Sequence, residues 1–210
     1  MRMQEAVMKL LLHQPFYGAL AAATSIRESR TVSKLQMTLS PSPLLEYNGA
    51  WFEALPDAQA LGALLHELTH LLLLHAVRRG GRDPMLWAVA CDLAVNQHIP
   101  PDMLPPDAAT LEKVARKIEH PLERGRSAEF YYDDMARLLD DGFSLLQREN
   151  TVTLQCGNVS LFTSELQSEE QVPETNAQAL KHTLNQIVDE AFQTGEVPEA
   201  AGAMTPSLMP

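Results

Sequence analysis

The stretch from residue 63 to residue 100, ALLHELTHLLLLHAVRRGGRDPMLWAVACDLAVNQHIP, contains the pattern HExxH, then a double glycine and a second apolar run. Residues four apart on an α-helix lie about 40° apart around its axis and about 6 Å along it. On a helix, the imidazoles of His66 and His70 can therefore converge on one metal ion. Glu67, about 100° round from His66, can reach a water on that ion without binding the metal itself. We expect His66 and His70 to be metal ligands and Glu67 to be a general base.

Two half-buried core histidines beside a solvated glutamate are the alternative interpretation of this pattern. The motif lies deep in a segment rich in Ala and Leu, residues 58–79, which we expect to form one continuous helix. Asp57 is placed to cap the start of this helix, and Gly80 and Gly81 follow its end. The position of the motif in a capped helix with a leucine-rich face favours the metal site.

His75 is not expected to be the third ligand. It lies nine residues after His66, about 180° round the helix. The four leucines before it include no glycine that would break the helix. We therefore expect His75 to face away from the metal, near the C-terminal end of the helix.

Asp92 is the predicted third ligand. A second helix is expected from Pro84 to about residue 98; His70 lies about 13 Å before the intervening turn, and Asp92 about 12 Å after it. An antiparallel helix pair would bring Asp92 level with His70, and would place Asn96, one turn further on, close to the site. An acid within an apolar segment is also costly to bury unless it is paired or bound to a metal. The alternatives are a structural role for Asp92, or a ligand from elsewhere in the chain: Glu129, Asp133, Asp134 or His98.

Two histidines, one carboxylate and an open position for water suit Zn²⁺. Such a site predicts a zinc-dependent metallopeptidase that hydrolyses peptide bonds through a zinc-activated water, with Glu67 as general base. Candidate donors to the developing oxyanion are Tyr131, Tyr132 and Arg78. The alternative is a non-catalytic, zinc-stabilised protein-binding module, which a fourth protein ligand from His98 or Glu129 would favour.

The composition, 45% hydrophobic and 20% charged residues, is ordinary for a globular protein. A net charge of -11 argues against a nucleic acid or an anionic membrane as partner. No run of apolar residues is long enough for a transmembrane helix, and residues 13–15 interrupt the apolar N-terminal segment before it reaches signal-peptide length. Cys91 and Cys156 form no CxxC pattern, which fits a reducing compartment, so we expect a cytoplasmic protein.

We expect an α+β fold that is mostly helical, with a small sheet and the HExxH motif on a helix. Further helices are predicted over residues 4–12, 17–24, 110–119, 128–141 and 176–194. Strands are predicted at residues 34–40 and in a hairpin over residues 150–166 that turns at Gly157 and Asn158, and Asn48 and Gly49 indicate a further turn. The predicted organisation is a metallopeptidase domain over residues 1–149, a hairpin-and-helix appendage over residues 150–195 and a disordered tail over residues 196–210.

Four segments resemble a zincin-like family, the metallopeptidase domain that commonly precedes a von Willebrand factor A-like domain in bacterial and phage proteins. They are QPFYGAL (14–20), LEYNGAWFEAL (45–55), HELTHLLLLHAVRRGGRDPMLWAVACDLAVNQHI (66–99) and RSAEFYYDDMARLL (126–139). The resemblance implies that His66 and His70 bind zinc, that Glu67 is the catalytic base and that Asp92 is the third ligand with Asn96 nearby. It departs at residues 150–210, which are too short for a von Willebrand factor A-like domain and lack its DxSxS motif.

Overall fold

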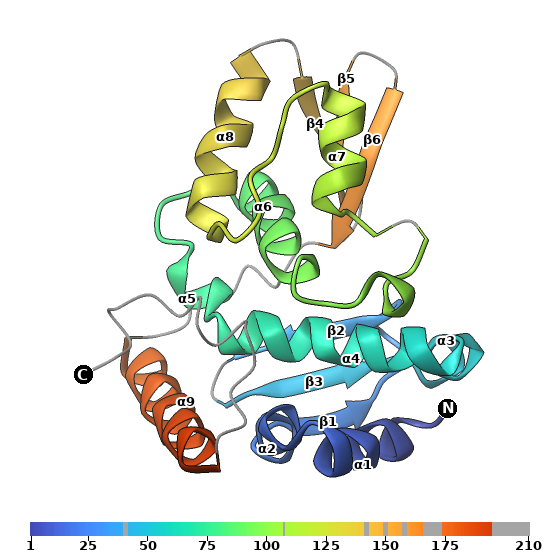
Figure 1. Cartoon of the computed structure of the whole chain (residues 1–210), viewed down its shortest axis with the longest axis vertical. Coiled ribbons are helices and arrows are strands. Elements are labelled where there is room, and N and C mark those ends of the chain that lie inside the picture. The colour runs from blue at the N-terminus through green and yellow to red at the C-terminus, as the bar shows by residue number, and fades with distance from the viewer. Residues whose placement is uncertain are drawn as a thin grey trace.

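The computed structural model describes residues 1–39, 42–106, 108–140, 143–148, 151–156, 159–165 and 174–194. These residues form a mixed α+β structure in which helices predominate (Figure 1). The helices are α1 (Met3–His13), α2 (Pro15–Ala22), α3 (Gly49–Ala54), α4 (Asp57–Leu72), α5 (His75–Arg78), α6 (Pro84–Asn96), the short 3-10 helix η1 (Pro101–Met103), α7 (Leu111–Ile118), α8 (Ala128–Asp140) and α9 (Glu174–Thr194). The strands are β1 (Ser25–Glu28), β2 (Leu35–Thr38), β3 (Leu44–Tyr47), β4 (Phe143–Arg148), β5 (Thr151–Cys156) and β6 (Val159–Glu165).

The first sheet has the order β1-β3-β2, with β3 at its centre. β3 pairs in parallel with β1 and antiparallel with β2, which lies at one edge of the sheet. Leu45 of β3 is fully buried in a hydrophobic core that also takes side chains from α1, α2, α4 and α9. Figure 1 shows α4 lying across this sheet, so the HExxH motif sits above the sheet on a helix that the core holds in place.

A second core lies around α6, with side chains from α7 and α8 packed against it. The second sheet lies next to α6, and its strands β4, β5 and β6 pair antiparallel in that order. The pairing of β5 with β6 confirms the predicted hairpin, while β4 was not predicted. The turn at Gly157 and Asn158 and the tail from residue 196 lie outside the described residues, and the division into domains stays a prediction.

The helix predicted over residues 58–79 is not continuous, and this prediction was wrong. α4 ends at Leu72, Leu74 adopts a left-handed conformation with φ 53° and ψ 36°, and α5 starts at His75. The side chains of residues 71–74 are all at most 3% exposed. A straight helix would spread four consecutive side chains over about 300° of its circumference. The break allows all four leucines to be buried while the chain changes direction.

Two turn and cap assignments also need correction. Asp57 is the first residue of α4, with Pro56 at the cap position, and its carboxylate pairs with the N-terminal amine and with Lys9. Asn48 and Gly49, predicted to form a turn, instead start a helix: Asn48 caps α3, its side-chain oxygen accepting a hydrogen bond from the Trp51 amide at 3.0 Å. In the described part of the chain, no helix has both the length and the hydropathy to span a membrane.

Candidate metal centre

Three potential metal ligands converge where α4 meets α6. The Nε2 atoms of His66 and His70 lie 2.9 Å apart, and Oδ1 of Asp92 lies 3.6 Å and 3.4 Å from them, respectively. A tetrahedral zinc site with bonds of about 2.0–2.1 Å has ligand atoms about 3.3 Å apart. The three distances are close to that value, so the donor atoms fit one Zn²⁺ without rearrangement of the helices.

The helices account for this placement. His66 and His70 lie one turn apart on α4, and Asp92 lies in α6 among almost wholly buried apolar neighbours. The His70 side chain is 3% exposed, that of Asp92 14% and that of His66 23%. The cluster is therefore buried at His70 and reaches the surface at His66, which leaves one side open.

Asn96 fixes the orientation of His66. Its side-chain Nδ2 donates to the Ala109 carbonyl at 2.8 Å, so its Oδ1 must be the atom 2.8 Å from His66 Nδ1. That oxygen can only accept, so Nδ1 of His66 carries the hydrogen. The lone pair of His66 is then on Nε2, which faces His70 and Asp92. This is the tautomer that a metal ligand needs.

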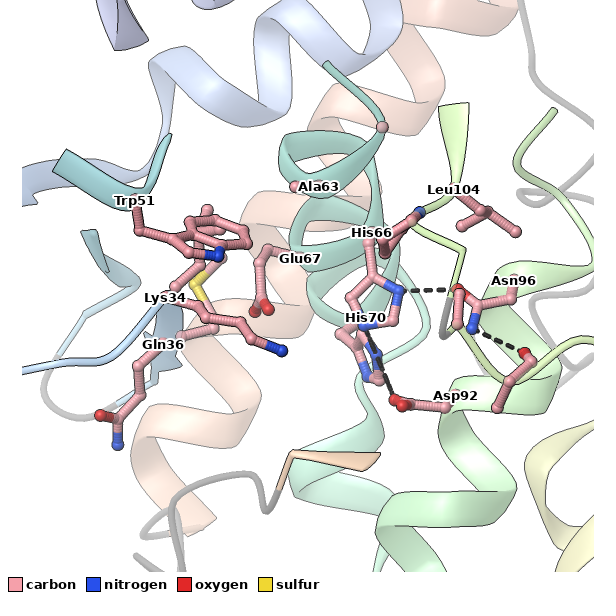
Figure 2. A pocket seen from close by; sticks show the side chains of 16 residues that line it. Lys34, Gln36, Trp51, Ala63, His66, Glu67, His70, Asp92, Asn96 and Leu104 are labelled. Carbon is pink, nitrogen blue, oxygen red and sulfur yellow. Dashed lines mark hydrogen bonds and ion pairs between the residues drawn. The ribbon is translucent and has the colours of Figure 1, made fainter. Parts of the chain in front are cut away.

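Glu67 lines a pocket whose floor is the histidine–aspartate cluster (Figure 2). One wall is β2 with the residue before it, Lys34, and the opposite wall is formed by residues 104–105 and 108–109. α4 passes close to this second wall at Gly62, where a Cβ would lie only 2.1 Å from the Met103 carbonyl oxygen. The residues that line the pocket are Lys34, Leu35, Gln36, Met37, Trp51, Gly62, Ala63, His66, Glu67, His70, Asp92, Asn96, Leu104, Pro105, Ala108 and Ala109.

The structure places the alternative ligands outside the cluster. Among the described residues, only His66, His70 and Asp92 bring metal-ligating atoms within 4.8 Å of one another at this point. Glu129 is bound by Arg78 through hydrogen bonds of 3.0 and 2.5 Å. Asp134 pairs with Arg137 and His120. Neither Asp133 nor His98 belongs to the group.

The candidate oxyanion donors also lie elsewhere. The Tyr131 hydroxyl contacts Gln97 Oε1 and the Glu123 carbonyl. The Tyr132 hydroxyl accepts a hydrogen bond from the Asp83 amide. Neither tyrosine nor Arg78 lines the pocket.

The prediction that His75 faces away from the site was wrong. Its Nδ1 lies 3.1 Å from Nδ1 of His70, and its side chain is fully buried. The break after α4 produces this contact, because Leu74 in the left-handed region turns the chain back toward His70. A left-handed conformation costs a non-glycine residue about 1–2 kcal/mol.

Lys34 is the pocket residue that sequence reasoning missed. It directly precedes β2 and is the basic side chain, apart from the histidines, that lines the pocket. Figure 2 shows its ammonium group directed into the same part of the pocket as the Glu67 carboxylate. The alternating pattern at residues 34–40 predicted the strand, but not that its start lies opposite the HExxH helix.

Comparison with known proteins agrees with the resemblance seen in the sequence. A family model described as "Putative metallopeptidase domain" matches residues 1–205. A protein of Thermotoga maritima, described as an uncharacterized protein, is 29% identical over 108 residues. The aligned part is 48% of this chain and 27% of that protein, so the chain spans well under two thirds of this relative. No solved structure matches. The match over residues 1–205 shows that this chain belongs to that metallopeptidase-domain family.

Proposed function

We propose that this protein is a zinc-dependent peptidase with a zincin-like active site, in which His66, His70 and Asp92 bind zinc and Glu67 is the general base. One observation carries the proposal. The two Nε2 atoms and Oδ1 of Asp92 face one another at the floor of a pocket that Glu67 also lines. Two imidazoles with one carboxylate form the donor set of a catalytic zinc site, whereas structural sites usually have four protein ligands.

A zinc ion held by these residues would supply Lewis-acid chemistry, lowering the pKa of a water and polarising the scissile carbonyl. Glu67 would accept the proton of that water and pass it to the leaving amine. Asn96 would hold His66 in the ligating tautomer through its hydrogen bond to Nδ1. Burial, followed by the charge of Asp92, raises the pKa of the neighbouring Cys91 thiol well above its usual value. This buried thiol does not belong to the group of metal-ligating side chains.

The unpaired edge of β2 is the structural argument for a peptide substrate. β2 pairs with β3 on one side, and no described strand pairs with its other edge. β2 contributes Leu35, Gln36 and Met37 to the pocket wall facing the HExxH helix. An unpaired strand edge offers backbone donors and acceptors that an extended peptide can bind. A substrate added to this edge would have its backbone beside Glu67 and the three ligands.

Lys34 would stabilise the negative charge that develops on the carbonyl oxygen. Its ammonium group enters the pocket from the wall opposite His66. A cation in a partly enclosed site favours an oxyanion over the neutral carbonyl. This role replaces those expected for Tyr131, Tyr132 and Arg78.

Substitutions of the two acidic residues Glu67 and Asp92 should have different effects, and this difference tests the proposal. Glu67→Gln retains all three ligands, so the protein should keep one zinc per chain while peptide hydrolysis falls by about two to four orders of magnitude. Asp92→Ala removes a ligand and leaves a polar void, so zinc affinity and melting temperature should fall together. Glu53→Gln, at an exposed glutamate of α3, is the matched control and should change neither.

The measurements are elemental analysis of protein purified without added metal, and cleavage of a casein or peptide-library substrate. Wild-type hydrolysis by Glu67→Gln would refute the catalytic role of Glu67. Stoichiometric zinc in Asp92→Ala, with wild-type melting behaviour, would refute the ligand set. Stoichiometric zinc with no hydrolysis of any peptide by the wild type would instead favour the non-catalytic binding module.

A further inference from the structure

His75 contacts the His70 ring on the side that faces away from the proposed metal position. Its Nδ1 lies 3.1 Å from Nδ1 of His70, on the side of the His70 ring opposite the Nε2 atom that faces His66 and Asp92. The two rings are nearly perpendicular, at 78°, with centroids 5.1 Å apart. Both residues are buried, His70 almost completely and His75 completely. Water therefore has little access to this hydrogen bond.

The chemistry of a metal ligand determines the direction of this hydrogen bond. If His70 binds a metal through Nε2, its remaining hydrogen is on Nδ1, which must donate. Nδ1 of His75 then accepts, and the hydrogen of His75 lies on Nε2. The opposite direction would place a hydrogen on Nε2 of His70, where the metal should bind.

We propose that His75 is a positioning residue of this centre, a neutral imidazole that accepts the Nδ1 hydrogen of His70 and holds its Nε2 toward the metal. The inference rests on the proposed metal site, and it adds a residue outside the HExxH motif. It gives each histidine ligand its own buried acceptor: Asn96 for His66, and His75 for His70. Such partners orient a ligand ring and increase its basicity.

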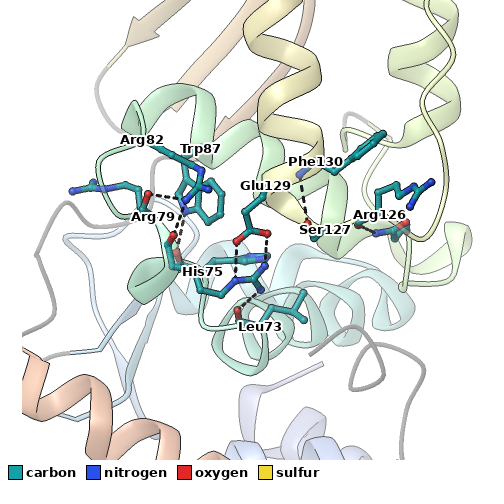
Figure 3. Close-up of polar contacts among 11 residues, drawn as sticks. Leu73, His75, Arg79, Arg82, Trp87, Arg126, Ser127, Glu129 and Phe130 are labelled. Atoms are coloured by element: carbon teal, nitrogen blue, oxygen red, sulfur yellow. Dashed lines mark hydrogen bonds and ion pairs between the residues drawn. The ribbon is translucent and has the colours of Figure 1, made fainter. Parts of the chain in front are cut away.

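The surrounding structure holds His75 in this place. Leu74 is in the left-handed region, and the guanidinium of Arg78 donates to the Leu73 carbonyl at 2.8 Å while it also binds Glu129 of α8 (Figure 3). The indole Nε1 of Trp87 donates to the His75 carbonyl at 2.9 Å. Hydrogen bonds thus connect the break to α6, the next long helix along the chain, and to α8, more than 50 residues further on.

Two features of this arrangement oppose stability, which argues that it serves the site. The left-handed Leu74 is one. The other is Nε2 of His75, a buried atom without a hydrogen-bond partner among the described atoms. An apolar side chain would avoid the second cost.

The first test uses the intact wild-type protein. Long-range proton–nitrogen correlation NMR of the histidine rings in the Zn²⁺-loaded protein should show His70 protonated at Nδ1 and His75 protonated at Nε2. Protonation of His75 at Nδ1 would overturn the proposal. This readout does not depend on whether any variant folds.

The second test compares His75→Leu with His75→Asn, two side chains of nearly the same shape. Asn carries an oxygen as many bonds from the backbone as Nδ1 of His, so it can still accept from His70, whereas Leu cannot. Zn²⁺ affinity, measured by competition with a chromophoric chelator, should fall by about tenfold to a hundredfold in His75→Leu and stay within about threefold of wild type in His75→Asn. The ligand-field absorption of the Co²⁺-loaded protein should shift in His75→Leu only.

The outcomes separate this inference from the proposed function. Equal Zn²⁺ affinity in the wild type and His75→Leu would overturn the role of His75 and leave the metal site standing. Equal loss of affinity in both variants, with lowered melting temperatures of the metal-free proteins, would show a merely structural residue. Failure of the wild type to bind Zn²⁺ would overturn the metal site and this inference together.

Discussion

Asn96→Ala should weaken zinc binding and stability by amounts that follow from two hydrogen bonds. The substitution removes the acceptor of the His66 Nδ1 hydrogen and the donor to the Ala109 carbonyl, each at 2.8 Å. A buried polar group left unpaired costs about 1–3 kcal/mol. His66 is 23% exposed, so water can partly replace its lost partner, whereas Ala109 is 2% exposed. We therefore expect a total loss of about 2–3 kcal/mol.

This loss translates into two measurable changes. A chain of this length loses about 2–4 °C in Tm per kcal/mol, so Tm of the metal-free protein should fall by about 4–12 °C. The part that concerns His66 is an orientation effect on the ligand, and it should weaken Zn²⁺ binding by about tenfold to a hundredfold. Calorimetry of the metal-free protein and chelator competition with Zn²⁺ measure the two quantities separately.

Asn96→Asp is the matched control, because it separates the two hydrogen bonds. One carboxylate oxygen can still accept from His66, but the other faces the Ala109 carbonyl without a hydrogen to donate. Tm should therefore fall while Zn²⁺ affinity stays near that of the wild type. Unchanged Zn²⁺ affinity in Asn96→Ala, or an equal loss of affinity in both variants, would refute the role assigned to the His66–Asn96 hydrogen bond.

Two further predictions concern the charged residues around the site. Lys34→Met should lower kcat for peptide hydrolysis by about a hundredfold without releasing zinc, and Lys34→Arg should restore most of the rate; full activity in Lys34→Met would exclude Lys34 as an oxyanion donor. Burial by itself raises the pKa of Glu129, but the hydrogen bonds and charge of Arg78 outweigh it and bring the pKa below its ordinary value of 4.5. The pair therefore stabilises the fold above that value, and its contribution is lost as the pH falls through the lowered pKa. Arg78→Met should reduce Tm most near about pH 7 and least near about pH 3, and a Tm difference independent of pH would contradict this interpretation.

The sequence by itself determined the features that depend on local rules. The HExxH spacing places His66 and His70 on one face of a helix whatever surrounds it. Asp92 was predicted as the third ligand from the helix rise and the double glycine, on the assumption of a straight helix to residue 79 and an antiparallel helix pair. The structure breaks that helix after Leu72, and α6 crosses α4 at a steep angle (Figure 1), yet Asp92 Oδ1 lies 3.4 Å from His70 Nε2. The start of the second helix at Pro84 was predictable for the same reason, since α6 begins there and Asp83 caps it by accepting a hydrogen bond from the Leu86 amide, three positions on.

Tertiary structure alone decided how the site is enclosed and supported. Helix propensity predicted one helix through residue 79, but the burial of four consecutive leucines and the ties from Arg78 to α8 and from Trp87 to His75 break it at Leu74. The parallel pairing of β1 with β3 leaves β2 at the sheet edge, which brings Lys34 into the pocket. These contacts join residues that lie 12 to 51 positions apart, and their energies depend on which surfaces are buried together. A local pattern carries no such information, so His75 and Lys34 became visible only in the folded chain.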